Sequence, residues 1–134
     1  MYLLDTNVIS ELRRPRPHPS VTRWIADIPS DQLFLSSVSV GEIQAGIENV
    51  RDRDPRKAYE LEVWLDDVVA SHAVLPMDVA AFREWARLKH RQSRALLEDA
   101  MIAATAVVHR LTVVTRNVRD YRRLGVEFLN PFEV

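Results

Sequence analysis

Short apolar runs alternate with helical patterns along the chain, and this alternation constrains the fold more than any other feature. Runs typical of strands lie at residues 1–4, 33–36, 73–75, 111–114 and 126–129. Apolar residues at helical spacing lie at residues 7–14, 20–28, 39–50, 54–71, 78–92, 96–110 and 117–124. Strands that alternate with helices pair in parallel through right-handed crossovers, which leaves helices on both faces of the sheet. The sequence therefore predicts an α/β fold of three layers, with a central parallel sheet of about five strands flanked by helices.

The size and composition of the chain exclude several classes of protein. A length of 134 residues predicts a single domain, residues 1–134, with enough buried surface to fold without disulfides. The absence of cysteine excludes disulfides and thiolate metal sites, and it fits a cytoplasmic protein. No apolar run approaches the ~20 residues of a membrane span, and the N-terminus lacks the pattern of a signal peptide. We therefore expect a soluble cytoplasmic protein with no membrane partner.

The balance of charges points only weakly to a partner. The net charge of −1 excludes a strongly basic nucleic-acid binder. All but two of the 18 basic residues are arginines, the exceptions being Lys57 and Lys89. Arginine binds phosphate or carboxylate through two parallel hydrogen bonds, but the codon usage of a GC-rich genome produces the same excess.

Four acids occupy positions where a parallel sheet binds its ligands. Asp5 directly follows the first strand, Glu42 lies in the first turn of the helix after the second strand, and Asp120 lies one helical turn past the fourth strand. Ligands of open α/β sheets bind beyond the carboxyl ends of the strands, so these three side chains can share one edge. Asp99 begins the helix that leads into the fourth strand, and it joins them if that helix start points to the same edge.

A cluster of this kind has a defined chemistry. Two carboxylates about 4 Å apart repel each other by roughly 4 kcal/mol at an effective dielectric constant of 20. Three or four together must take up protons or bind a cation. An oxygen-only set of ligands suits Mg²⁺ or Mn²⁺ rather than Zn²⁺. Such an ion can activate water and neutralise charge on a phosphodiester under attack.

Each of these acids also has a purely structural interpretation. Asp5 could cap the first helix, although Thr6 and Asn7 are equally suitable caps. Ser39 and Glu42 have the spacing of a capping box, in which each residue satisfies a backbone donor of the helix start. Asp120 could be a surface charge among neighbouring arginines. The polar residues ahead of it, Thr115 and Asn117, could cap its helix or orient a carboxylate or water.

Helical spacing separates the adjacent acids Glu98 and Asp99. Asp99 shares its stripe with three apolar residues, Ile102, Ala103 and Ala106. Glu98 shares its stripe with Met101, Thr105 and His109, which we expect to be better hydrated. An acid on a buried stripe is harder to ionise and needs a functional reason, whereas Glu98 is explained by the helix dipole alone. We therefore predict a functional role for Asp99 rather than for Glu98.

Three segments in order resemble one known family. "LLDTNVISEL" near the start, "SSVSVGEIQAGI" in the middle and "EDAMIAATAVVHRLTVVTRNVRDY" near the end resemble a PIN domain, most closely the VapC-type toxins of the FitB-like branch. The resemblance covers nearly the whole chain. It implies a ribonuclease that depends on Mg²⁺ or Mn²⁺, acts on RNA, and is neutralised by a cognate antitoxin protein.

The resemblance also assigns roles to individual residues. It matches Asp5, Glu42, Asp99 and Asp120 to the four acids of the family's catalytic site, with Asp5 and Asp99 as the main metal ligands. Similar toxins form homodimers, and the apolar helical faces around Trp64 and Val68 are the candidate seam here. The supporting polar residues are Asn7, Thr115 and Asn117.

The sequence departs from similar proteins at two places. The segment "RQSRALLED" before the third acid has neither the Gly nor the Pro that is often found there, so it does not define the shape of this loop. Tyr121 follows the fourth acid where Phe is common.

Two other functions would also place acids at the ends of strands or keep the fold without catalysis. A phosphoacceptor signalling domain would need an acidic pair near the first strand and a lysine after the last core strand, whereas this chain has Asp5 alone and Arg116. A catalytically silent PIN-like module that binds RNA or a protein partner is the closer alternative. The presence of all four acids favours the enzyme.

Overall fold

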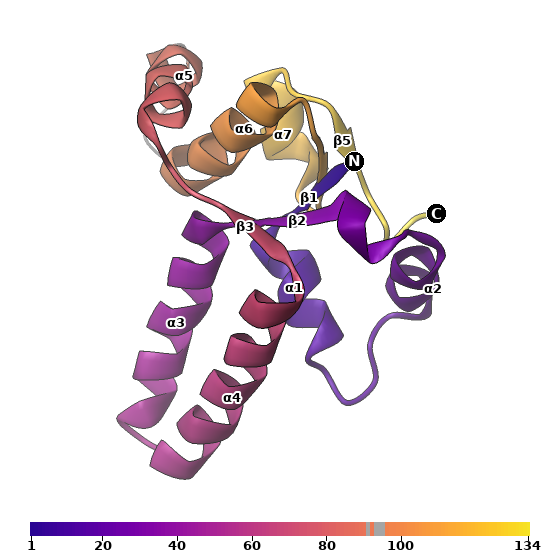
Figure 1. Cartoon of the computed structure of the whole chain (residues 1–134), viewed down its shortest axis with the longest axis vertical. Helices are drawn as coiled ribbons and strands as arrows, with labels where there is room; N and C mark the ends of the chain where they lie inside the picture. Colours follow the sequence, from indigo (N-terminus) through magenta and orange to yellow (C-terminus); the bar gives the residue numbers. More distant parts are fainter. Residues whose placement is uncertain (91, 93–95) are drawn as a thin grey trace.

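A five-stranded sheet, with every strand parallel to its neighbours, forms the centre of the molecule (Figure 1). The computed structural model describes the chain except for residues 91 and 93–95. The strands lie in the order β3-β2-β1-β4-β5. Their bounds are β1 Tyr2–Leu4, β2 Leu33–Ser36, β3 Ala73–Leu75, β4 Thr112–Val114 and β5 Phe128–Leu129.

Helices cover both faces of this sheet (Figure 1). One face carries α6, with α7 beside it and α5 packed on the outer side of α6. The other carries α1, α2 and α4, and α3 runs alongside α4. The helix bounds are α1 Thr6–Leu12, α2 Pro19–Asp27, α3 Ser37–Arg51, α4 Pro55–Ser71, α5 Val79–His90, α6 Leu97–His109 and α7 Val118–Leu124, with a 3₁₀ helix, η1, at Ser30–Gln32.

Local sequence features explain where α4 begins and where α7 ends. Asp54 caps α4 by accepting a hydrogen bond from the Lys57 backbone N–H at 3.1 Å, and a proline follows it at the first helical position. Helix α7 ends at Gly125, which has a φ of +71°. This left-handed conformation favours glycine, because other residues place a Cβ too close to the backbone.

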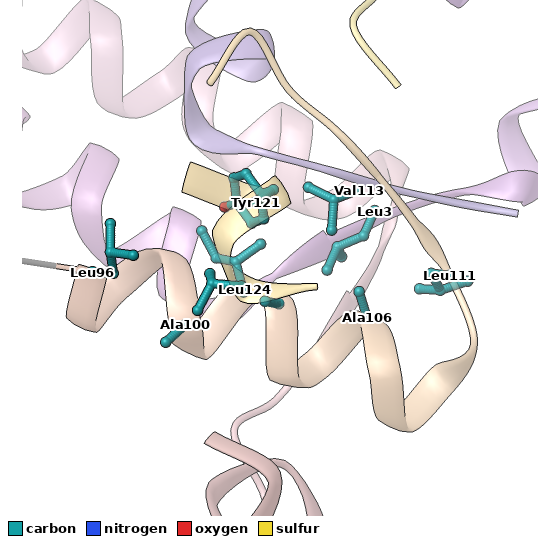
Figure 2. Close-up of a cluster of buried hydrophobic side chains, with 10 residues drawn as sticks. Leu3, Leu96, Ala100, Ala106, Leu111, Val113, Tyr121 and Leu124 are labelled. Atoms are coloured by element: carbon teal, nitrogen blue, oxygen red, sulfur yellow. The ribbon is translucent and has the colours of Figure 1, made fainter. Parts of the chain in front are cut away.

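The two faces of the sheet bury separate clusters of apolar side chains. Leu3 points to the face covered by α6 and α7, and its neighbour Leu4 points to the opposite face, as alternation along a strand requires. Figure 2 shows the first cluster, in which α6 contributes Ala100 and Ala106 and α7 contributes Tyr121. Strand β1 is therefore buried on both of its faces, which accounts for its continuous apolar sequence.

The predicted architecture is confirmed: three layers surround a parallel sheet of five strands. The strands predicted at residues 33–36 and 73–75 have those bounds, while the last strand is limited to Phe128–Leu129. Helix α3 starts two residues earlier than predicted, because Ser36 rather than Ser39 is its N-cap. Within the described residues, no helix is long and apolar enough to cross a membrane.

Candidate active site at the carboxyl edge of the sheet

The candidate acids lie where the order of strands reverses direction along the chain. From β1 the chain passes to β2 and β3 on one side, and later to β4 and β5 on the other. The crevice at the carboxyl ends of β1 and β4 is the usual ligand site of such a sheet. Helix α6 runs down to the start of β4, so its N-terminus lies at this same carboxyl edge. The condition for Asp99 to join the other acids is therefore met.

Asp5 is the most buried acid of the group, with 3% of its surface exposed. Its Oδ1 accepts from the Thr6 backbone N–H at 2.8 Å, which makes it the N-cap of α1. Its Oδ2 accepts from Thr115 Oγ1 at 2.8 Å and from Asn7 Nδ2 at 3.1 Å. Burial raises the pKa of this carboxyl, and the hydrogen bonds offset part of the rise. Asp5 thus caps a helix and also contributes to the acid cluster.

Thr115 and Asn117 connect the first acid to the third. The Asn117 backbone N–H donates to Thr115 Oγ1 at 2.9 Å, and Thr115 Oγ1 donates to Asp5. The Asn117 side chain donates through Nδ2 to Asp99 Oδ2 at 3.1 Å. Asn117 occupies the N-cap position of α7 but forms no side-chain capping bond there. Both side chains therefore donate to carboxylates, and Thr115 also accepts a hydrogen bond from the backbone at the start of α7.

Glu42 is held by a residue that the sequence indicated only as a possible cap. Thr6 Oγ1 forms hydrogen bonds with Glu42 Oε1 at 2.9 Å and with Ser39 Oγ at 2.8 Å. The alternative interpretation of Glu42 as part of a capping box is excluded, because α3 begins at Ser37 and places Glu42 in its second turn. Glu42 is half-buried, and burial raises the pKa of its carboxyl. The hydrogen bond from Thr6 offsets part of this rise, and the charges of Glu98 and Asp5 add to it.

Asp99 lies among the other acids of the cluster. Its pKa is raised from 3.8 to about 7, first by burial and then by the charges of Asp5, Asp120, Glu42 and Glu98. All the predicted acids therefore lie close enough to oppose its ionisation. The site is crowded with negative charge, and it gains stability from protons or a cation.

Glu98 lies close enough to the cluster to affect it, which the sequence did not predict. Its side chain is exposed, as expected, yet its charge raises the pKa of both Glu42 and Asp99. The prediction of a hydrated stripe behind it is also wrong at Thr105, which is fully buried and donates to the Met101 carbonyl at 3.0 Å. Met77, in the segment between β3 and α5, lies against this threonine, with its Sδ 3.4 Å from Thr105 Oγ1. Asp99 still begins the buried stripe, as predicted.

Comparison with known proteins identifies the family. A family model described as PIN domain matches residues 2–127. This chain belongs to the PIN-domain family. It is 34% identical to "VapC ribonuclease Y4jK" from Sinorhizobium fredii, over 99% of each chain, and 32% identical to "Toxin FitB" from Neisseria gonorrhoeae, over 98% of this chain and 99% of that one. Among solved structures it is similar to "FitAcB" from Neisseria gonorrhoeae, with a TM-score of 0.90, 31% identity and full coverage of both chains.

The donor chemistry of this PIN domain fits a hard divalent cation. The cluster offers carboxylate, hydroxyl and amide oxygens, the donor type that Mg²⁺ and Mn²⁺ prefer. In the described part of the chain, no group of three or more Asp, Glu, His or Cys side chains is placed so that it could hold a metal ion. Mg²⁺ usually binds through one or two carboxylates and keeps several waters, so two acids suffice for it.

A cleft rich in arginine lies beside the acids of the PIN domain. It measures about 270 Å³ and includes Asn7, Arg13, Arg14 and Arg116 in its lining. Asn7 joins the cleft to the cluster, because its Nδ2 donates to Asp5 while its Oδ1 accepts from the Arg116 backbone N–H at 3.1 Å. The Arg116 guanidinium lies 4.4 Å from the centre of the Phe132 ring, which limits its movement.

The sequence therefore predicted most of the residues that meet here. The structure brings together Asp5, Glu42, Asp99 and Asp120 with the supporting Asn7, Thr115 and Asn117. It adds Thr6 and Glu98, whose roles were underestimated. The shape of the loop before Asp99 depends on residues 91 and 93–95, which lie outside the described residues.

Proposed function

We propose that this protein is a divalent-cation-dependent ribonuclease that hydrolyses RNA phosphodiester bonds and acts as the toxin of a toxin–antitoxin pair, with residues 1–134 as one catalytic domain. The observation that carries the proposal is that Asp5, Glu42 and Asp120 gather around Asp99 at the carboxyl edge of the sheet. Relatives named VapC ribonuclease and Toxin FitB, each similar over almost the whole chain, support the same function.

In this proposal Asp5 and Asp99 hold the cation, Mg²⁺ or Mn²⁺, and Glu42 and Asp120 complete or orient its surroundings. A bound divalent cation lowers the pKa of water and neutralises charge on a phosphodiester. Three polar side chains keep the carboxylates in place, each through the bonds already described: Asn7, Thr115 and Asn117.

The arginine cleft would bind the RNA backbone next to the acids. Among the described residues, neither Arg13 nor Arg116 is paired with a carboxylate, so their charges are available to phosphate. Guanidinium groups bind phosphate oxygens through paired hydrogen bonds. Such contacts hold the strand without reading its sequence, and they reduce the repulsion between a polyanion and the acid cluster.

Two protein partners belong to the proposal. The family resemblance implies a cognate antitoxin that blocks the acid cluster until it is removed. The predicted homodimer seam around Trp64 and Val68 stays a prediction, since both side chains also pack against the protein's own core. Light scattering on the purified protein would measure the oligomeric state.

The test is cleavage of a mixed RNA pool by the purified chain in Mg²⁺, in Mn²⁺ and in chelator. We expect cleavage only with a divalent cation, and loss of cleavage in Asp5→Asn and Asp99→Asn. The matched control is Asp31→Asn, an exposed acid on η1, which should cleave as the wild type does. Cleavage that persists in chelator, or in both cluster variants, would contradict the metal-dependent mechanism.

The silent binding module predicts a different outcome of the same experiment. It would bind RNA and Mn²⁺ but leave every RNA in the pool intact under all conditions. The presence of the complete set of acids around Asp99 favours the enzyme.

A further inference from the structure

One polar atom at the acid cluster is not used by the site described so far. Tyr121 is fully buried, and its hydroxyl has no hydrogen-bond partner among the described residues. Buried polar groups are nearly always paired, so each exception calls for an explanation. A phenylalanine of the same shape would fill the space without an unpaired hydroxyl and would make the unliganded protein at least as stable.

The surroundings of Tyr121 place this hydroxyl at the base of the acid cluster. Its ring lies in the core cluster with Leu3, Val113 and Leu124 (Figure 2). The hydroxyl is close enough to Asp5 to lower the pKa of that carboxyl, although no hydrogen bond of good geometry joins them. A phenolic hydroxyl is protonated at neutral pH, so the Tyr121 O–H group can donate a hydrogen bond to the Asp5 carboxylate.

The hydrogen bonds of Asp5 leave room for one more donor. Thr6 and Thr115 each donate to a different oxygen of the carboxylate, both at 2.8 Å. Asn7 Nδ2 is shared, because it lies 3.1 Å from Asp5 Oδ2 and 3.3 Å from Thr115 Oγ1. A carboxylate has about four lone-pair sites, so Asp5 can accept a further hydrogen bond from Tyr121.

We propose that Tyr121 is a positioning residue of the cation site, whose hydroxyl donates to the Asp5 carboxylate in the cation-bound protein and fixes the orientation that holds the ion. This inference rests on the proposed function. A hydrogen bond to an ionised carboxylate is shorter and about twice as strong as one between neutral groups. Because the hydroxyl is fully buried, it acts through that carboxylate and does not touch RNA.

The test compares Mn²⁺ binding by the full chain and by Tyr121→Phe, with free Mn²⁺ measured by electron paramagnetic resonance. We expect the dissociation constant for Mn²⁺ to rise roughly tenfold, as for loss of a hydrogen bond to a charged group. The melting temperature in chelator should stay the same or increase. Tyr2→Phe is the matched control, because the Tyr2 ring packs on Trp24 in the opposite core cluster, and its Mn²⁺ affinity should not change.

Three outcomes would overturn the inference, and they are distinguishable from one another. Equal Mn²⁺ affinity in Tyr121→Phe and the wild type, with binding lost in Asp99→Asn, would leave the cation site standing and remove the role of Tyr121. A lower melting temperature of Tyr121→Phe in chelator would assign the hydroxyl to the stability of the unliganded protein. Absence of Mn²⁺ binding by the wild type would reject the proposed function and this inference together.

Discussion

Replacing Asp99 with asparagine should stabilise the metal-free protein above neutral pH while it abolishes cation binding. Asparagine keeps an oxygen that can accept the 3.1 Å hydrogen bond from Asn117 Nδ2, but it removes the charge that burial and four neighbouring acids oppose. An acid whose pKa is raised in the folded state holds a proton that the unfolded chain has released. The stability it contributes is therefore lost as the pH rises from about 4 to about 7.

The expected size of the effect follows from the rise in pKa. A rise from 3.8 to about 7 would correspond to about 4 kcal/mol for a fully buried group. Asp99 is only half-buried, and solvent screening reduces the figure to roughly 1–2 kcal/mol. For a chain of this length, that is a rise in melting temperature of roughly 3–8 °C.

The assay is thermal unfolding of the wild type and Asp99→Asn in chelator, at several pH values from about 3.5 to about 8.5, a range that spans both the unfolded and the folded pKa of Asp99. The variant should be more stable at pH 8, and the difference should shrink as the pH falls and vanish below about pH 4, where the wild-type carboxyl is protonated in the unfolded chain as well as in the folded protein. Added Mg²⁺ should stabilise the wild type at pH 8 and leave the variant unchanged. A stability difference that does not depend on pH, or a variant that is less stable at pH 8, would refute the electrostatic reasoning.

Three further predictions test single contacts. Thr115→Val leaves Asp5 Oδ2 and the Asn117 backbone N–H without their shared partner, so urea unfolding should show a loss of about 1–3 kcal/mol, and an unchanged midpoint would contradict this. Arg116→Ala should weaken RNA binding severalfold, measured in chelator by fluorescence anisotropy. The control Arg56→Ala, at an exposed side chain of α4, should not change the affinity, and equal affinities of the two variants would remove the cleft from the proposal. Gly125→Ala should lower stability by about 1 kcal/mol in calorimetry, because its φ of +71° strains alanine, and a stabilised variant would argue against that conformation.

The location of the site was predictable from patterns that extend over many residues. Asp5 and Asp120 were placed by the strands that precede them, and a parallel sheet brings the ends of its strands to one edge. Asp99 required one more step: a helix that leads into a parallel strand begins at the carboxyl edge. Each of these predictions depends on the direction of an element, and the order of elements along the chain determines direction.

The errors arose where one local pattern allowed several structures. The segment "SSVS" offers three serines as caps for α3, and the choice of Ser36 is fixed by the end of β2, which sequence spacing does not resolve to one residue. The contact of Thr105 with Met77, which comes from the segment between β3 and α5, is one that the stripe of α6 alone does not contain. Glu98 was assigned to the helix dipole, but its proximity to Glu42 depends on how α3 and α6 approach each other.

The central claim is that Asp5 and Asp99 together hold a divalent cation at the carboxyl edge of the sheet. Anomalous diffraction from crystals of the wild type soaked in Mn²⁺ tests it most directly. The account predicts one strong anomalous peak within coordination distance of both carboxylates, absent from crystals of Asp99→Asn treated in the same way. A peak elsewhere with none at these acids, or no peak in well-diffracting wild-type crystals, would contradict it.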